Sequence, residues 1–126
     1  MIPIGDIQTQ IQSALSQFID RPNTSQVRER MRSEVERLMH QNIQQGLCYI
    51  DGNCIYAEDM HFIQGLIMAG KLNVGEWYEV YIKGEHIGRI RDKSGMYSSY
   101  GSIQWDVDIE LDKPVDYVKV EVAMKE

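Results

Sequence analysis

The residues best suited to chemistry are a short run of acids with one histidine, Glu58-Asp59-Met60-His61. Carboxylate oxygens and an imidazole nitrogen are metal ligands, so Glu58, Asp59 and His61 are candidates for the site of a metal-dependent hydrolase. Acidic residues also suit the start of a helix, because they interact with the positive end of the helix dipole. We favour this second interpretation.

The two cysteines, Cys48 and Cys54, lie on either side of a turn-forming triplet, Asp51-Gly52-Asn53. They could face one another across that turn, but free buried thiols are the more usual state of cysteines in a protein made in the cytoplasm. Neither belongs to a C-x-x-C pair, and no nucleophile elbow, phosphate loop or dinucleotide fingerprint is present. The sequence therefore predicts a protein that is not an enzyme and holds no cofactor or metal.

Charged side chains are the remaining candidates, and they form two groups of opposite sign. The basic group lies on one predicted helix and consists of Arg28, Arg30, Arg32 and Arg37. The acidic group lies on one face of a predicted strand and consists of Asp106, Asp108, Glu110 and Asp112. Each group has an ordinary interpretation: a solvated strand face for the acids, and for the arginines a solvated helix face paired with Glu29, Glu34 and Glu36. Alternatively, the arginines of one copy meet the acids of a neighbour, where such complementarity sets register and orientation.

The composition limits which partners are plausible. The chain has 126 residues, of which 43% are hydrophobic and 25% charged, and these values fit one globular domain spanning residues 1–126. Its net charge of −6 argues against direct binding to nucleic acid, which needs a cationic surface. We expect no membrane-spanning segment and no secretory signal, and hence a protein made in the cytoplasm.

Two helices are predicted in the first third of the chain. Apolar residues recur every three or four positions from Ile4 to Ile19, which indicates an amphipathic helix of about four turns that ends before Pro22. Asn23 is the expected cap of a second helix, with Thr24 and Ser25 as alternatives. The apolar face of the second helix consists of Val27, Met31, Val35, Leu38, Met39 and Ile43. Gly46 is the residue expected to stop it.

The remaining elements are mainly strands. A short hairpin is expected around Asp51-Gly52-Asn53, and residues 58–72 suit a short helix, which we favour, or a buried strand. Residues 77–83 alternate as a strand and turn back into 87–91, whereas 92–102 is predicted to be an irregular surface loop. From Ile103 to Leu111 every second residue is apolar, and a similar alternation follows Pro114, so the chain is expected to end in two antiparallel strands. The predicted class is α+β, with two N-terminal amphipathic helices packed on a mainly antiparallel sheet that ends in a β-hairpin.

This order of elements resembles the C-terminal domain of contractile phage tail sheath proteins. The residues that carry the resemblance are Phe18 and Asn23-Thr24 before the second helix, Val27, Val35 and Leu38 along it, Gly46-Leu47 after it, and the segment 107–120 with its Lys113-Pro114 turn. The similarity covers residues 7–50 and 103–124. Residues 55–102 stand as a β-rich insertion relative to that family, and the large domains that precede it in a sheath subunit are not found here.

The resemblance implies a structural role in a virion. Sheath subunits join their neighbours by adding terminal strands to each other's sheets, so an open sheet edge is expected to receive such a strand. The function expected is that of a sheath-like end, baseplate or neck component of a contractile phage tail, made in the host cytoplasm. Its expected partners are sheath, tube or baseplate proteins and further copies in a homo-oligomeric ring. The alternative is a small ligand- or carbohydrate-binding module with an aromatic platform of Trp77, Tyr78, Tyr81, Tyr97, Tyr100 and Trp105.

Overall fold

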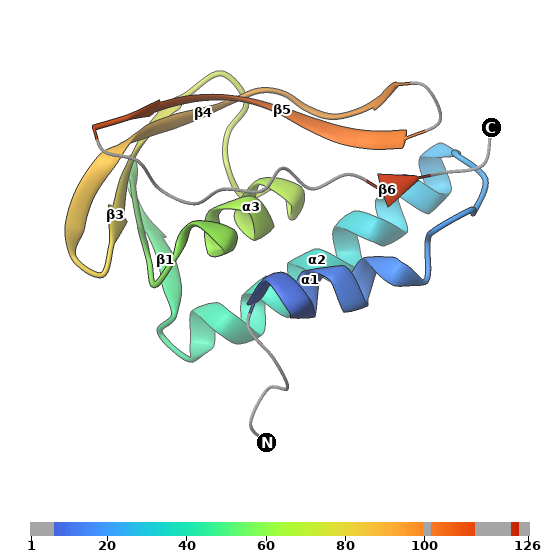
Figure 1. Ribbon diagram of the computed structural model, residues 1–126, viewed down its shortest axis with the longest axis horizontal. Coiled ribbons are helices and arrows are strands. Elements are labelled where there is room, and N and C mark those ends of the chain that lie inside the picture. Colours follow the sequence, from blue (N-terminus) through green and yellow to red (C-terminus); the bar gives the residue numbers. More distant parts are fainter. Residues whose placement is uncertain (1–6, 100–101, 113–121, 124–126) are drawn as a thin grey trace.

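The computed structural model describes the backbone of residues 7–99, 102–112 and 122–123, and the side chains of residues 7–93 and 107–112. Within these residues there are three helices and six strands (Figure 1). The helices are α1 (Ile7–Ser16), α2 (Ser25–Gln44) and α3 (Met60–Met68). The strands are β1 (Cys48–Asp51), β2 (Cys54–Ala57), β3 (Trp77–Ile82), β4 (Glu85–Ser99), β5 (Ser102–Leu111) and β6 (Val122–Ala123).

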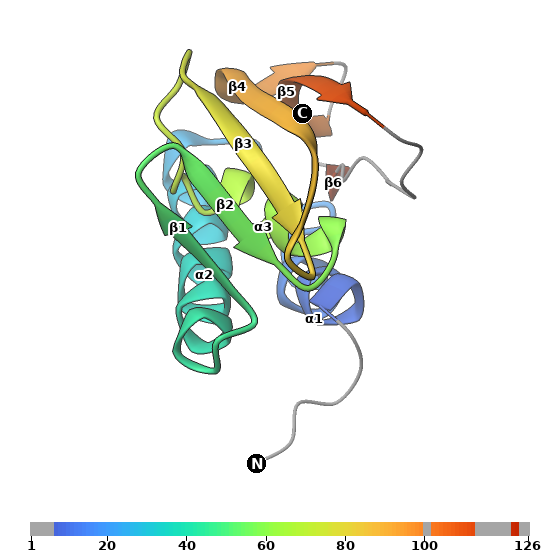
Figure 2. The ribbon, with the colours of Figure 1, turned by 90° about the vertical axis from the view of Figure 1, so that its left-hand side faces the viewer.

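The strands form one sheet in sequence order, from β1 at one edge to β6. Neighbours pair antiparallel except β2 and β3, which are parallel because α3 carries the chain back between them. The three helices cover one face of the sheet and leave the other uncovered (Figures 1 and 2). The expected α+β class, with two N-terminal helices on a mainly antiparallel sheet, is confirmed, and α3 is a third helix in the same layer.

Helix α2 begins and ends close to the predicted positions. Its cap is Thr24, whose side chain accepts a hydrogen bond from the Val27 N–H at 3.2 Å. Asn23, the first choice from the sequence, instead accepts a hydrogen bond from Arg28 at 2.8 Å. Gly46 has a φ of 77° and donates to the Ile43 carbonyl, while the Leu47 N–H donates to the Asn42 carbonyl. This pair of bonds is the Schellman arrangement, so the predicted glycine stop is confirmed.

Helix α1 ends three residues before Ile19, where the predicted apolar pattern ends. It ends at Ser16, and turn hydrogen bonds from Phe18 and Ile19 follow it. Phe18 is buried, but Ile19 is 54% exposed and therefore does not belong to the apolar face that packs in the core. The helix stops early because the chain must bend toward α2, which it does through Asp20 at a φ of 62°. Ile4 lies outside the described residues.

Helix α3 is the centre of the core, and the preference for a helix over a strand in this segment is confirmed. Every residue from Phe62 to Met68 is buried. Asp59 caps the helix by accepting a hydrogen bond from the His61 N–H at 2.8 Å. Gly65 lets α3 approach α2 and α1 closely, since a Cβ at this position would meet Met39 and Ile11.

The predicted loop at residues 92–102 is wrong. Strand β4 continues through this segment to Ser99, and β5 starts at Ser102, so the two form one long antiparallel pair. Glycine, serine and tyrosine suggested a loop, but the alternating strand β5 supplies a pairing partner and determines the local conformation. The register shifts between Asp92 and Gly95, so the residues between them form a β-bulge in β4.

The predicted alternating strand from Ile103 is confirmed as β5. Of the second alternation, Val122 and Ala123 pair antiparallel with Ile103 and Ser102, while the Lys113-Pro114 turn lies outside the described residues. The segment 55–102, which the resemblance treats as an insertion, supplies β2, α3, β3 and β4. These elements form the middle of the sheet and much of the core.

Candidate interaction surface

The uncovered face of the sheet, called the open face below, carries aromatic and charged side chains. Alternation along each strand places one set of residues toward the helices and the other toward solvent. The inward set is buried and includes Ile55, Ala57, Tyr78, Val80, Ile87 and Ile90. The described side chains of the open face include Tyr49, Asp51, Cys54, Tyr56, Trp77, Glu79, Tyr81, His86, Arg89, Arg91, Asp108, Glu110 and Asp112.

Three tyrosines form a stacked row across β1, β2 and β3, and this set, Tyr49, Tyr56 and Tyr81, is called the tyrosine row. The ring centroids of Tyr49 and Tyr56 are 4.8 Å apart, and those of Tyr56 and Tyr81 are 4.9 Å apart. The rings are nearly parallel because Tyr56 is in register with Tyr49 on one side and with Tyr81 on the other. Their separation equals the usual spacing of neighbouring strands, about 4.8 Å.

The row ends differently on its two sides. On the β4 side, His86 meets Tyr81 edge-on with a centroid distance of 5.2 Å. On the β1 side, Tyr49 is 48% exposed and has no further strand beside it in the described sheet. Partial burial between its neighbours, followed by contact with Cys54, raises the pKa of the central Tyr56 phenol. The central Tyr56 phenol is therefore neutral at physiological pH.

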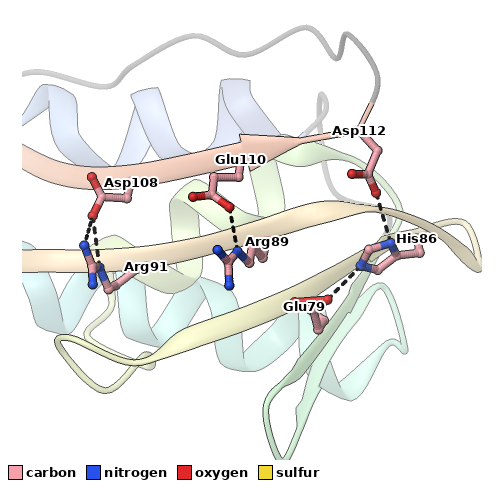
Figure 3. Close-up of polar contacts among 7 residues, drawn as sticks. All are labelled: Glu79, His86, Arg89, Arg91, Asp108, Glu110 and Asp112. Carbon is pink, nitrogen blue, oxygen red and sulfur yellow. Dashed lines mark hydrogen bonds and ion pairs between the residues drawn. The ribbon is translucent and has the colours of Figure 1, made fainter.

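A charge ladder lies beside the row on β3, β4 and β5 (Figure 3). His86 contacts Glu79 at 3.0 Å and Asp112 at 3.3 Å, so it joins β3 to the residue that follows β5. Arg89 donates to Glu110 at 2.7 Å, and this hydrogen bond raises the pKa of the Arg89 guanidinium.

The last rung of the ladder is Arg91, which donates to Asp108 through Nε at 2.9 Å. The guanidinium carbons of Arg91 and Arg89 lie 4.7 Å and 4.2 Å from the centre of the Trp77 ring. The open face thus pairs each of these cations with a carboxylate and an aromatic ring.

A bulge in β4 puts His86 and Arg89 on the same face although they are three residues apart. Val80 pairs with Gly88, and the next residue of β3, Tyr81, pairs with His86. Strand β4 therefore has one extra residue, Ile87, between these two pairs. Ile87 and Ile90 can then both be buried. Gly88 makes this possible, because its backbone lies against Glu110 and Leu111 with a φ of 146°.

The predicted acidic residues lie on the open face, but their partners in the structure are not the predicted arginines. Asp108, Glu110 and Asp112 pair with Arg91, Arg89 and His86 of the same sheet. The side chain of the fourth predicted acid, Asp106, lies outside those described. The sequence analysis missed the cations of β4, Arg89 and Arg91, because it did not pair their strand with β5, which carries the acids.

The predicted arginines lie on α2, in the helical layer on the other side of the sheet. Arg28 donates to Asn23, and Arg30 lies 5.8 Å from the centre of the Phe18 ring. Arg32 pairs with Glu29 at 3.3 Å, and Arg37 pairs with Glu34. Within one chain the structure does not bring these arginines to the acids whose side chains are described, Asp108, Glu110 and Asp112, so a contact with those acids requires a neighbouring copy.

Of the predicted aromatic platform, Trp77 and Tyr81 lie on the open face. Tyr78 is buried in the core, where its hydroxyl accepts a hydrogen bond from the Asn73 N–H at 2.9 Å. The side chains of Tyr97, Tyr100 and Trp105 lie outside those described. The sequence reasoning omitted Tyr49 and Tyr56, although a two-residue hairpin loop after Asp51 puts them in register.

The two cysteines do not face each other, contrary to one of the possibilities raised by the sequence. Cys48 is opposite Ala57 and Cys54 is opposite Asp51, so their side chains lie on different faces of the sheet. Both are free thiols, and burial raises the pKa of Cys48 to about 11. A thiol with so high a pKa is a poor nucleophile at neutral pH.

The acidic run before α3 acts as a helix start, as the favoured interpretation expected for Asp59. His61 lies with Nδ1 3.5 Å from the Asp59 carboxylate. Among the described residues, no group of three histidine, cysteine, aspartate or glutamate side chains could hold a metal ion. In the same part of the chain, no helix has the length and apolar character needed to cross a membrane.

Comparison with protein-family models, with curated proteins and with solved structures finds no match to this chain.

Proposed function

We propose that this chain is a structural virion protein of a contractile phage tail, a sheath-like end, baseplate or neck component that docks other tail proteins through its open face. The order of its elements supports this proposal. A helix, a second helix stopped by Gly46, a short strand and a long alternating strand follow one another as the resemblance implies. In this role the protein assembles as a ring with sheath, tube or baseplate proteins and acts without catalysis, cofactor, nucleic acid or membrane.

The observation that carries the proposal is the tyrosine row on a sheet face without helices. Aromatic side chains are enriched in protein interfaces, where their large rigid rings bury area at a low cost in conformational entropy. Tyr49 is 48% exposed, and Tyr56 and Tyr81 are half-buried, so the row presents ring edges and hydroxyls to a partner. A flat partner surface can bury all three side chains together.

The charge ladder makes this face suitable for repeated docking. Burying an unpaired charge is costly, but Arg89 and Arg91 already hold Glu110 and Asp108 within the chain. A partner that covers the face therefore meets paired charges, which set orientation more than affinity. In this arrangement the α2 arginines remain on the opposite side of the molecule, where they can contact an acidic neighbour.

A binding assay with purified tail proteins tests the proposal. The chain is immobilised, and sheath, tube and baseplate proteins of the phage that encodes it are passed over the surface. We expect one of them to bind, and the double variant Tyr56→Ser/Tyr81→Ser to weaken binding at least tenfold. The matched control is Val74→Ser, since Val74 is also a large apolar side chain, is 58% exposed and lies in the loop before β3. Lack of binding to every tail protein, or equal loss in the control, would contradict the proposal.

A second candidate is supported by a hollow at one end of the tyrosine row. Its volume is about 480 Å³, and its lining includes Tyr49, Tyr56, Glu58 and Lys83. Aromatic rings beside a carboxylate and an ammonium group suit a small sugar or another polar ligand. In this case the protein would bind a soluble oligosaccharide, Tyr56→Ser would abolish that binding, and no tail protein would be retained.

A further inference from the structure

Strand β1 is an edge strand without the usual protection against pairing with another chain. It is the outermost strand on its side of the sheet (Figure 2). Natural edge strands commonly carry lysine, proline or a bulge that prevents pairing. The sequence of β1 is Cys48-Tyr49-Ile50-Asp51, with regular pairing to β2 and one charge at the end next to the turn.

The alternation of hydrogen-bonded and non-hydrogen-bonded pairs in the β1–β2 hairpin shows which backbone groups of β1 point outward. The Glu58 N–H donates to the Leu47 carbonyl at 3.1 Å, so residues 47 and 58 form a hydrogen-bonded pair. Such pairs alternate along an antiparallel ladder, which makes Tyr49 with Tyr56 the next one. The backbone groups of Cys48 and Ile50 therefore point away from β2, toward the free edge.

We propose that two copies of this chain pair through their β1 strands in antiparallel orientation about a two-fold axis between the two Tyr49 residues. In this register Cys48 of one copy is opposite Ile50 of the other, and the outward groups of these residues form about four backbone hydrogen bonds. Tyr49 is then opposite its own equivalent as a non-hydrogen-bonded pair, the closest type, with Cα atoms roughly 4.5 Å apart.

The tyrosine row is the reason to choose a second copy as the occupant. Its rings repeat at 4.8 and 4.9 Å, and among the described side chains no ring continues the stack on the outer side of Tyr49. A second Tyr49 in the neighbouring strand supplies that ring at the same spacing, so three tyrosines from each copy form one continuous stack. The charges are also compatible, because Asp51 is opposite Leu47 of the other copy and not opposite the second Asp51.

This contact does not depend on the tail proposal. An isologous contact closes after two copies, so a ring needs a second, different contact. The pairing joins the open faces of two copies into one larger surface. Since the strand contributes only four residues, the interface is at the small end of specific interfaces, and we expect the dimer to dissociate on dilution.

Disulfide trapping tests both the pairing and its register. In a Cys54→Ser background, Tyr49→Cys brings two cysteines to the two-fold axis, within the Cα separation that a disulfide requires. Mild oxidation at high protein concentration should convert most of this variant to a covalent dimer. The matched control is Asp51→Cys, since the two copies of residue 51 would lie four residues out of register, roughly 13 Å apart along the strand. Equal cross-linking of both variants, or of neither, would overturn the proposal.

Sedimentation velocity of the unmodified chain completes the test. We expect a monomer–dimer equilibrium that Tyr49→Lys weakens at least tenfold, because two ammonium groups would meet at the axis. Val74→Lys, an equivalent exposed change away from β1, should leave the equilibrium unchanged. A monomer at all concentrations up to several hundred micromolar would contradict the inference.

Discussion

Gly88 allows β4 and β5, two of the strands that carry the open-face side chains, to approach each other closely. A Cβ at this position would overlap the Glu110 carbonyl oxygen and lie 2.7 Å from the Leu111 Cα, and both groups belong to the backbone of β5. Its φ of 146° is also a conformation that other residues rarely adopt. We therefore predict that Gly88→Ala separates β4 from β5 near the bulge.

The expected cost has two parts. The strained backbone contributes roughly 1–3 kcal/mol. Displacing β5 weakens the pairing of Gly88 with Leu111 and of Arg89 with Glu110, and losing about two hydrogen bonds adds roughly 2 kcal/mol. The free energy of unfolding should fall by about 3–5 kcal/mol, a large part of the roughly 5–15 kcal/mol typical of a domain.

Urea denaturation followed by circular dichroism measures this change, and Gly84→Ala is the matched control. Gly84 has a φ of 80°, but nothing lies within 4 Å of the point that an alanine Cβ would occupy, so only the backbone strain, about 1–2 kcal/mol, applies there. If Gly88→Ala costs no more than Gly84→Ala, the close approach of β4 and β5 does not constrain the face as argued.

Two further predictions concern the core. Burial raises the pKa of Cys48 from 9.0 to about 11, so the unfolded chain loses this proton first and the free energy of unfolding should fall as pH rises from 9 to 11. The fall should be about 2–3 kcal/mol larger in the unmodified chain than in Cys48→Ala in parallel denaturation series, and identical slopes would refute it. Gly65→Ala would push a methyl group into the Met39 side chain and approach Ile11 Cδ1 to 3.3 Å, at a cost of about 1–3 kcal/mol. Because Met39 is flexible, Met39→Ala should relieve part of that cost in a double-mutant cycle, whereas strict additivity would show that the two residues are not coupled.

Much of the fold could be predicted because the strongest patterns are local. The periodic apolar residues of α2 and the glycine after it act within a few residues of the chain, and so does the alternation of β5. The segment 92–99 could not be predicted in the same way. Its Gly95 and neighbouring serines favour a loop locally, and only pairing with β5 makes it a strand.

The candidate site likewise combines contacts that follow from the local sequence with contacts that depend on the pairing of distant strands. The pairing of Tyr49 with Tyr56 follows from a two-residue loop and was accessible to sequence reasoning. The contact between Tyr56 and Tyr81 was not, because it depends on the parallel pairing that α3 creates between distant strands. Likewise, the acids of β5 could be assigned to one face from their spacing, but their partner Arg89 could be identified only once the antiparallel pairing of β4 with β5 was known.

Mass spectrometry of purified contractile-tailed particles tests the central proposal most directly. Particles of the phage that encodes this chain are separated from free protein by density gradient, and the peptides of the chain are quantified against those of the sheath and tube. The proposal predicts that the chain co-purifies with tails at a fixed ratio and remains after a high-salt wash. Particles that contain sheath and tube in normal amounts but lack this chain would contradict it.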